Sequence, residues 1–230
     1  MSTNKIFTFG DGYATGHIWP EWPQILAALL PDYVVLNNSG VGAGPEWLVN
    51  QFVNKIPHLH DTTVIFQWPQ ANRFDKLIED TTWQNTADTD PVYAFNQHNS
   101  WWLSSASTQQ PVVEYHNKFV QTKQHASRLS TYKILVEQTL KNNLCNYLFI
   151  TTEDQQNFAL RSCFKNTRQS EVQPSPIVHL AYVNDIILPQ LSGIKVDIDR
   201  YQEIANRICQ HKWVAYDPNR AEIWNKMSAV

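Results

Sequence analysis

The stretch that decides the fold is residues 5–30, KIFTFGDGYATGHIWPEWPQILAALL. A short apolar run at residues 6–9 ends at Gly10, Asp11 and Gly12, and an amphipathic segment with helical spacing follows. Pro23 suits the first turn of such a helix. The stretch therefore predicts a buried strand, a tight turn and a helix, with Gly12 at the position that the turn presents.

Three further apolar runs have the same character, at residues 33–36, 63–67 and 146–151. They are short, rich in Val, Ile and Phe and without clean alternation, which is typical of strands buried on both faces. Helical spacing appears at residues 22–30, 45–56, 130–143 and 199–213. The apolar faces of the last three are predicted at Trp47, Leu48, Phe52, Val53 and Ile56, at Tyr132, Leu135, Val136 and Leu140, and at Tyr201, Ile204 and Ile208.

This alternation of strands and helices predicts an α/β fold with a mostly parallel sheet between helices, in one domain over residues 1–230. The pattern fails between residues 80 and 129, a polar, almost uncharged segment. It holds six aromatic residues: Trp83, Tyr93, Phe95, Trp101, Trp102 and Tyr115. We interpret it as an ordered insertion over one edge of the sheet that turns helical near residue 113. A second irregular segment is expected at residues 152–178.

The inserted segment has the composition of an interface, because Asn, Gln and Ser cost less to desolvate than Lys or Glu. We therefore predict that its aromatic side chains bind a partner. The alternative is that the segment folds back and covers its own rings.

Composition excludes several classes of function. The chain has 230 residues, only 17% of them charged, a net charge of −3 and no run of Lys and Arg, which argues against nucleic-acid binding. No window reaches the roughly 18 apolar residues of a membrane span, and no signal-peptide pattern is present. Cys145, Cys163 and Cys209 lack CxxC spacing and are interpreted as free thiols. We expect no metal or cofactor and synthesis in a cytoplasm.

Residues 7–30 resemble the first block of the SGNH (GDSL-type) hydrolase family, in which a Gly-Asp-Ser turn presents the catalytic serine. Residues 33–52, YVVLNNSGVGAGPEWLVNQF, resemble the second block, with Gly42 as the glycine of the oxyanion hole and Gly40 as the alternative. Residues 64–75, VIFQWPQANRFD, stand where the family has Gly-x-Asn-Asp, so Ala71 or Asn72 matches the oxyanion asparagine. The resemblance implies a flavodoxin-like three-layer sandwich.

The family's last block, Asp-x-x-His-Pro, has one candidate, HKWVAYDPNRAEIWNKM at residues 211–227. If Pro218 matches the proline, Asp217 stands at the histidine and Val214 at the aspartate. If Asp217 is instead the aspartate, Arg220 stands at the histidine. Neither register gives an Asp–His pair.

The resemblance therefore implies a member without its catalytic triad. Gly12 has no side chain with which to attack a substrate. A carboxylate at Asp217, with an ordinary pKa of about 4, is a poor proton shuttle at neutral pH, and Val214 cannot orient a base. We expect a non-catalytic remnant pocket of Asp11, Gly12, Gly42 and Asn72.

The variant blocks also resemble tailed-phage proteins of this family, which implies a binding or structural role among protein partners in a phage particle. Two alternatives stay open. One is an esterase or carbohydrate deacylase with an unplaced nucleophile, and the other is a module that binds a glycan in the remnant pocket.

Several polar residues have a structural and a functional interpretation. Asp11 is expected to cap the backbone of its turn, and Ser39 to be a turn residue instead of a displaced nucleophile. His17 is expected to be a structural donor. His58 and His60 lack the further ligands of a metal site.

Overall fold

The computed structural model describes residues 4–12, 14, 20–40, 42–70, 73, 75–78, 94–97, 100–104, 122–163, 175–191 and 193–210. The strands are β1 (Asn4–Phe9), β2 (Tyr33–Asn37), β3 (Thr63–Trp68), β4 (Asp75–Ile78), β5 (Ala94–Gln97), β6 (Ser100–Ser104) and β7 (Asn146–Thr151). The helices are α1 (Trp22–Leu29), α2 (Pro45–Lys55), α4 (Thr122–Asn142), α5 (Thr152–Cys163), α6 (Pro176–Tyr182) and α7 (Ile198–Gln210). A π-helical turn follows α6 at Val183–Ile187.

The main sheet contains the four predicted strands, all parallel, in the order β2-β1-β3-β7. Ile6 of β1 lies opposite Val35 of β2 and Thr63 of β3, and Phe66 of β3 lies opposite Phe149 of β7. The chain is therefore an α/β protein, as its alternating pattern predicted. All four strands end at the same edge of the sheet.

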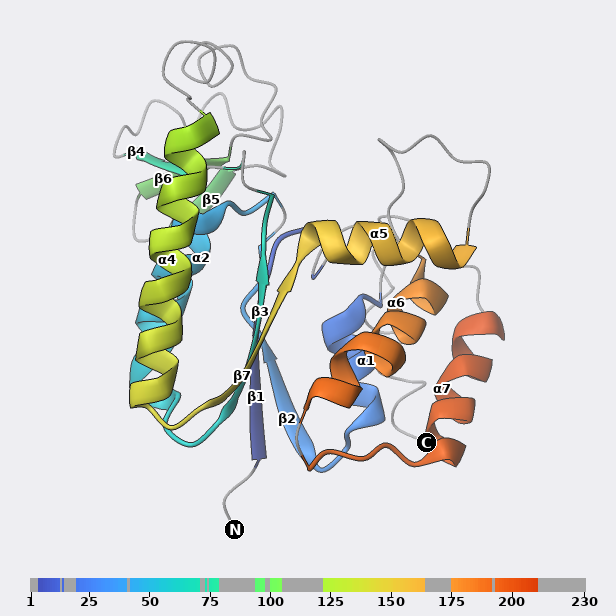
Figure 1. Ribbon diagram of the computed structural model, residues 1–230. Coiled ribbons are helices and arrows are strands. Elements are labelled where there is room, and N and C mark those ends of the chain that lie inside the picture. Colours follow the sequence, from blue (N-terminus) through green and yellow to red (C-terminus); the bar gives the residue numbers. More distant parts are fainter. Residues whose placement is uncertain are drawn as a thin grey trace.

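Helices lie on both faces of this sheet (Figure 1). The helices α2 and α4 cover one face, and α1, α6 and α7 lie on the other. Successive residues of a strand point to opposite faces, so Ile6 packs with Trp22 and Ile25 of α1, whereas Phe7 belongs to the cluster below α2 and α4. In that second cluster, the Phe9 and Phe66 rings stack with their centroids 5.3 Å apart.

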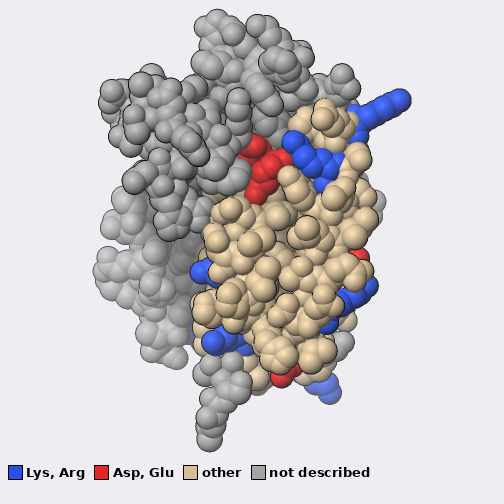
Figure 2. Space-filling model, turned by 90° about the vertical axis from the view of Figure 1, so that its left-hand side faces the viewer, with Lys and Arg blue, Asp and Glu red and all other residues tan. Residues whose placement is uncertain are grey.

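The outer surface of α2 and α4 carries few charges. Figure 2 looks onto this face, and most of its described surface belongs to uncharged residues. Acidic and basic side chains meet near the upper end of the face. No helix in the described part of the chain combines the length and the apolar character needed to cross a bilayer.

A second sheet, which the sequence did not predict as such, joins β4, just before the inserted segment, to β5 and β6 within it. Its strands are antiparallel in the order β4-β6-β5, and Trp102 of β6 lies opposite Leu77 of β4 and Phe95 of β5. In Figure 1 this sheet lies at the level of the upper turns of α4. The expected start of a helix near residue 113 falls outside the described residues, and α4 begins at Thr122.

Three expectations about local structure were wrong. Residues 152–178 were expected to be irregular, but α5 occupies Thr152–Cys163 and α6 begins at Pro176. The strand β2 was expected to be buried, but it forms an edge and leaves Val34 and Leu36 exposed. Val53 of α2 and Leu135 of α4 are also exposed, because each lies beside the stripe that contacts the sheet. Three predicted core positions are half-buried, Ile56, Tyr132 and Tyr201. The remaining ones are buried: Trp47, Leu48, Phe52, Val136, Leu140, Ile204 and Ile208. Cys145 and Cys209 are free thiols, as expected.

Candidate functional site

The loops that follow β1 and β2 meet at the carboxyl edge of the parallel sheet. The Asn38 amide donates to the Thr8 carbonyl over 2.8 Å, and the Gly40 amide donates to the Gly10 carbonyl over 3.0 Å. In open α/β sheets, ligands bind at this edge, because the loops converge there. This edge is therefore the candidate site.

The residues predicted for a remnant pocket divide into those that the structure describes and those that it does not. Gly12 is half-buried in the turn after β1, and Gly42 lies in the loop after β2 with a φ of 71°, which glycine adopts without strain. Asp11, next to Gly12 in the same turn, is only 3% exposed. Asn72 and its alternative Ala71, and Val214 and Asp217 of the last block, lie outside the described residues.

The Asp11 carboxylate is engaged in hydrogen bonds below the turn. The Thr152 hydroxyl, at the start of α5, donates to Asp11 Oδ2 over 2.9 Å, and Gln67 Nε2 donates to Asp11 Oδ1 over 3.4 Å. Thr152 and Gln67 are 2% and 0% exposed. The carboxylate therefore ties the turn after β1 to β3 and α5.

Gln67 is the centre of this arrangement. Its Oε1 accepts from Trp22 Nε1 of α1 over 2.9 Å, and its Nε2 donates to Gln155 Oε1 of α5 over 3.0 Å. The Gln67 side chain lies so close to the backbone of Gly10 that this position requires glycine. A Cβ on residue 10 would lie 3.0 Å from Gln67 Oε1 and 2.7 Å from the Ala14 Cβ. One amide side chain thus connects four elements of the fold.

The network ends at His179 of α6. Gln155 Nε2 lies 3.0 Å from His179 Nδ1 and can only donate, so Nδ1 accepts and the ring proton resides on Nε2. Complete burial lowers the pKa of His179 to about 3, so the imidazole is neutral at pH 7. We name the set Asp11, Trp22, Gln67, Thr152, Gln155 and His179 the Gln67 network.

These contacts are those of a structural network. Each member is nearly inaccessible to solvent, and the one histidine is neither charged nor placed beside a hydroxyl by any hydrogen bond of the described residues. A general base needs a pKa near the working pH and contact with the group that it deprotonates. The Gln67 network provides neither.

Ser39 is the described hydroxyl of this edge that was considered as a displaced nucleophile. Its backbone amide donates to Asn37 Oδ1 over 3.1 Å, and its Oγ is buried without a hydrogen-bond partner among the described residues. Asn37 in turn bonds Thr8 Oγ1 and the Ala14 carbonyl, so it holds the loops after β1 and β2 together.

The aromatic residues predicted to bind a partner are placed in part. Phe95 lies on β5, and Trp101 and Trp102 lie on β6, so all three belong to the antiparallel sheet. Trp83, Tyr93 and Tyr115 lie outside the described residues. The partner surface stays a prediction.

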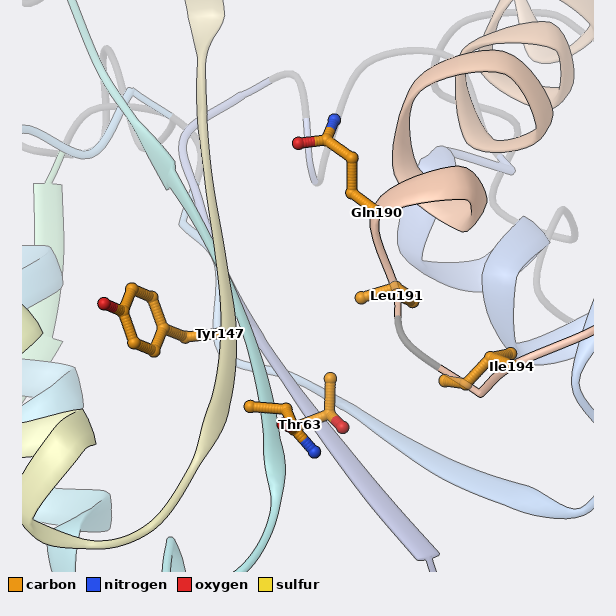
Figure 3. A pocket seen from close by; sticks show the side chains of 6 residues that line it. Thr63, Tyr147, Gln190, Leu191 and Ile194 are labelled. Carbon is orange, nitrogen blue, oxygen red and sulfur yellow. The ribbon is translucent and has the colours of Figure 1, made fainter.

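A shallow hollow lies at the opposite edge of the parallel sheet. It encloses about 340 Å³, open solvent included, at the amino ends of β3 and β7, beside Thr63, Asn146, Gln190, Leu191 and Ile194. Figure 3 shows Tyr147 pointing away from Leu191 and Ile194, toward α4, where its hydroxyl donates to Glu137 over 2.9 Å. The hollow is therefore separate from the candidate site.

Sequence reasoning missed Gln67, Thr152, Gln155 and His179. Gln67 carried a signal, since it is the polar residue inside the apolar run VIFQW. Thr152 and Gln155 lie in TTEDQQ, which was expected to be irregular, and His179 has no motif around it. Comparison of this chain with protein-family models, with curated proteins and with solved structures found no match.

Proposed function

We propose that this chain is a non-catalytic binding or structural module built on a flavodoxin-like three-layer sandwich that resembles the SGNH hydrolases. The strand order supports the fold part of this proposal. Numbered along the chain, the four parallel strands have the order 2-1-3-4, which agrees with the first four positions of the flavodoxin-like order. Helices on both faces fit the same architecture.

The observation that carries the proposal is the state of the turn after β1. Gly12 offers no nucleophile, and the adjacent Asp11 carboxylate is buried and hydrogen-bonded to Thr152 and Gln67. Covalent catalysis at this turn needs an exposed nucleophile and an adjacent base. The groups present instead join β1, β3 and α5, so they stabilise the fold.

The role in an assembly rests on the aromatic inserted segment and on the resemblance to tailed-phage proteins. An antiparallel sheet that bears Phe95, Trp101 and Trp102 is a suitable scaffold for a contact surface, because large aromatic side chains dominate many protein interfaces. The proposed partners are other proteins of a phage particle.

Labelling with a fluorophosphonate, together with an aryl-ester assay, tests the absence of catalysis. We expect no labelling and no turnover in the wild type, and none in Gly12→Ser, since a serine at this turn would still lack a base. The alternative enzyme would use the unpartnered Ser39 hydroxyl. Stoichiometric labelling that Ser39→Ala abolishes would overturn the proposal.

The assembly part needs a separate test. A Trp101→Ala, Trp102→Ala double variant should keep the circular dichroism spectrum of the wild type and no longer sediment with a large particle in its native setting. Ile198→Ala, which removes an exposed apolar side chain on α7, is the control and should sediment as the wild type does. Equal sedimentation of all three proteins would contradict the assembly role, and binding on a glycan array would favour the lectin-like alternative.

A further inference from the structure

Asp75, the first residue of β4, connects the antiparallel sheet to the main domain. Its two carboxylate oxygens lie 2.9 and 2.8 Å from the Gly44 amide, and Oδ2 also accepts from the Trp47 amide over 3.0 Å. Both amides belong to the amino-terminal end of α2. The Asp75 residue is only 6% exposed, so these contacts lie inside the protein.

The contact replaces a helix cap that α2 lacks. Gly44 occupies the position that precedes the helix and has no side chain with which to bond the first turn. The first amides of a helix have no partner within it, and their partial positive charge favours an anion. The Asp75 carboxyl group, on β4, supplies the oxygens that accept from these amides. One interaction therefore both caps α2 and docks β4.

A second carboxylate stands beside the first. Glu46 Oε2 accepts from the Asp75 amide over 2.8 Å, and Glu46 Oε1 forms an ion pair with Arg128 Nε of α4, also over 2.8 Å. Arg128 Nη2 lies 2.6 Å from His125 Nδ1. Among the described residues, the charged and titratable groups that face the pair are Arg73 before β4, and His125, Arg128 and Tyr132 on α4.

We propose that Asp75 and Glu46 form a proton-dependent clamp, which holds the β4-β6-β5 sheet on the main domain most tightly when Asp75 is protonated and loosens as the pH rises. This proposal does not rest on the proposed function. The clamp acts because two acids share one buried interface between β4, α2 and α4. Ionising Asp75 there creates a buried charge beside that of Glu46.

The direction of the effect follows from the balance of forces at Asp75. Burial raises the pKa of Asp75 to about 7, the Glu46 carboxylate also raises it, and the Trp47 and Gly44 amides and Arg73 oppose the rise. In the opened state the carboxyl recovers a pKa of about 4. The protonated form therefore stabilises the docked sheet fully below about pH 4, and this stabilisation is lost as the pH rises from about 4 to about 7.

Hydrogen exchange of individual strands tests the clamp in the intact protein. Protection factors, corrected for the intrinsic pH dependence of exchange, are compared for the amides of residues 76–78 in β4 and 6–9 in β1. From pH 5 to pH 7 we expect the protection of β4 to fall about fiftyfold relative to that of β1. If the protection factors of β4 and β1 change by the same factor over this range, the proposal is overturned.

Two variants and one direct titration sharpen the test. Asp75→Asn should remove the pH dependence of β4, and Glu46→Gln should move it to lower pH, because Asp75 then lacks a neighbouring negative charge. Asp32→Asn, at an exposed position before β2, is the control and should behave as the wild type. If Asp75→Asn fails to fold, NMR titration of the Asp75 carboxyl carbon in the wild type decides: a midpoint near 7 supports the clamp, and one near 4 overturns it.

Discussion

Two buried polar clusters of the molecule differ in the chemistry at their centres. The Gln67 network is built around a side-chain amide that cannot titrate, and it joins elements of the main domain. The cluster at Asp75 is built around two carboxylates and joins the main domain to the antiparallel sheet. The Gln67 network provides rigidity at any pH that leaves His179 neutral. The strength of the contact at Asp75, by contrast, depends on whether Asp75 is protonated.

The two clusters also oppose each other as the pH changes. His179 has a lowered pKa, so the stabilisation that its neutral form provides is present above about pH 6.5 and is lost as the pH falls toward 3. Asp75 has a raised pKa, so its contribution grows as the pH falls from 7 to 4. A protein that contains both can have a nearly flat stability profile in mildly acidic solution although each cluster titrates strongly.

The largest effect is expected from Gln67→Leu. This change leaves Trp22 Nε1, Gln155 Oε1 and Asp11 Oδ1 without a hydrogen bond that each now makes inside the protein. We expect the free energy of unfolding to fall by about 3–5 kcal/mol in urea denaturation at pH 7. Gln70→Leu, at a half-buried position that bonds Gln156, is the matched control and should cost less than about 1 kcal/mol. Equal losses of unfolding free energy in the two variants would show that Gln67 contributes no more to stability than Gln70 does.

Gly10→Ala tests how closely the turn approaches the network. The new methyl would meet the Ala14 Cβ at 2.7 Å and the Gln67 side chain at 3.0 Å, so we expect a loss of about 2–3 kcal/mol by thermal unfolding. Gly193→Ala separates this clash from backbone strain, because that residue has a φ of +77° and no neighbour within 4 Å of the new atom. The control should lose about 1 kcal/mol, from strain alone.

A pair of variants tests the opposition between the clusters. Between pH 6.5 and pH 5, His179→Gln should gain about 2 kcal/mol of stability relative to the wild type, because it no longer loses a neutral histidine. Over the same interval Asp75→Asn should lose a similar amount relative to the wild type. The measurement is chemical denaturation at four pH values, with His58→Gln, at an exposed position, as the control. If the stability difference from the wild type changes with pH in the same direction in both variants, the two clusters do not oppose each other.

The smallest effect is expected from Thr152→Val. It removes the hydroxyl that donates to Asp11 Oδ2 and keeps the volume of the side chain, so we expect a loss of about 1 kcal/mol. Thr152→Ser retains the donor and should be closer to the wild type. A larger loss for the serine variant would assign the effect to packing.

The sequence predicted the parallel sheet well because its strands depend on local apolar runs. It predicted the inserted sheet poorly, because β4, β5 and β6 are short and their pairing joins residues as distant as Asp75 and Ser104. The helix α5 was missed because its residues are largely polar.

The candidate site was predicted in outline only. The turn at Gly12 and the loop at Gly42 were visible as motifs, whereas the Gln67 network arises from side chains up to 141 positions apart, as with Asp11 and Thr152. No local pattern encodes such a contact. The Asp75 clamp has the same origin, since a cap supplied by another sheet leaves no signature beside the helix that it caps.

The strand order has a consequence for how the chain acquires its structure. β1, β2 and β3 are neighbours both in the chain and in the sheet, whereas β7 pairs with β3 only after the whole inserted segment and α4 have intervened. Closing so long a connection is entropically costly and slow, so the three N-terminal strands should assemble first and β7 should dock late. Pulse-labelling during refolding should then protect the amides of β1 before those of β7, and simultaneous protection would indicate one concerted step.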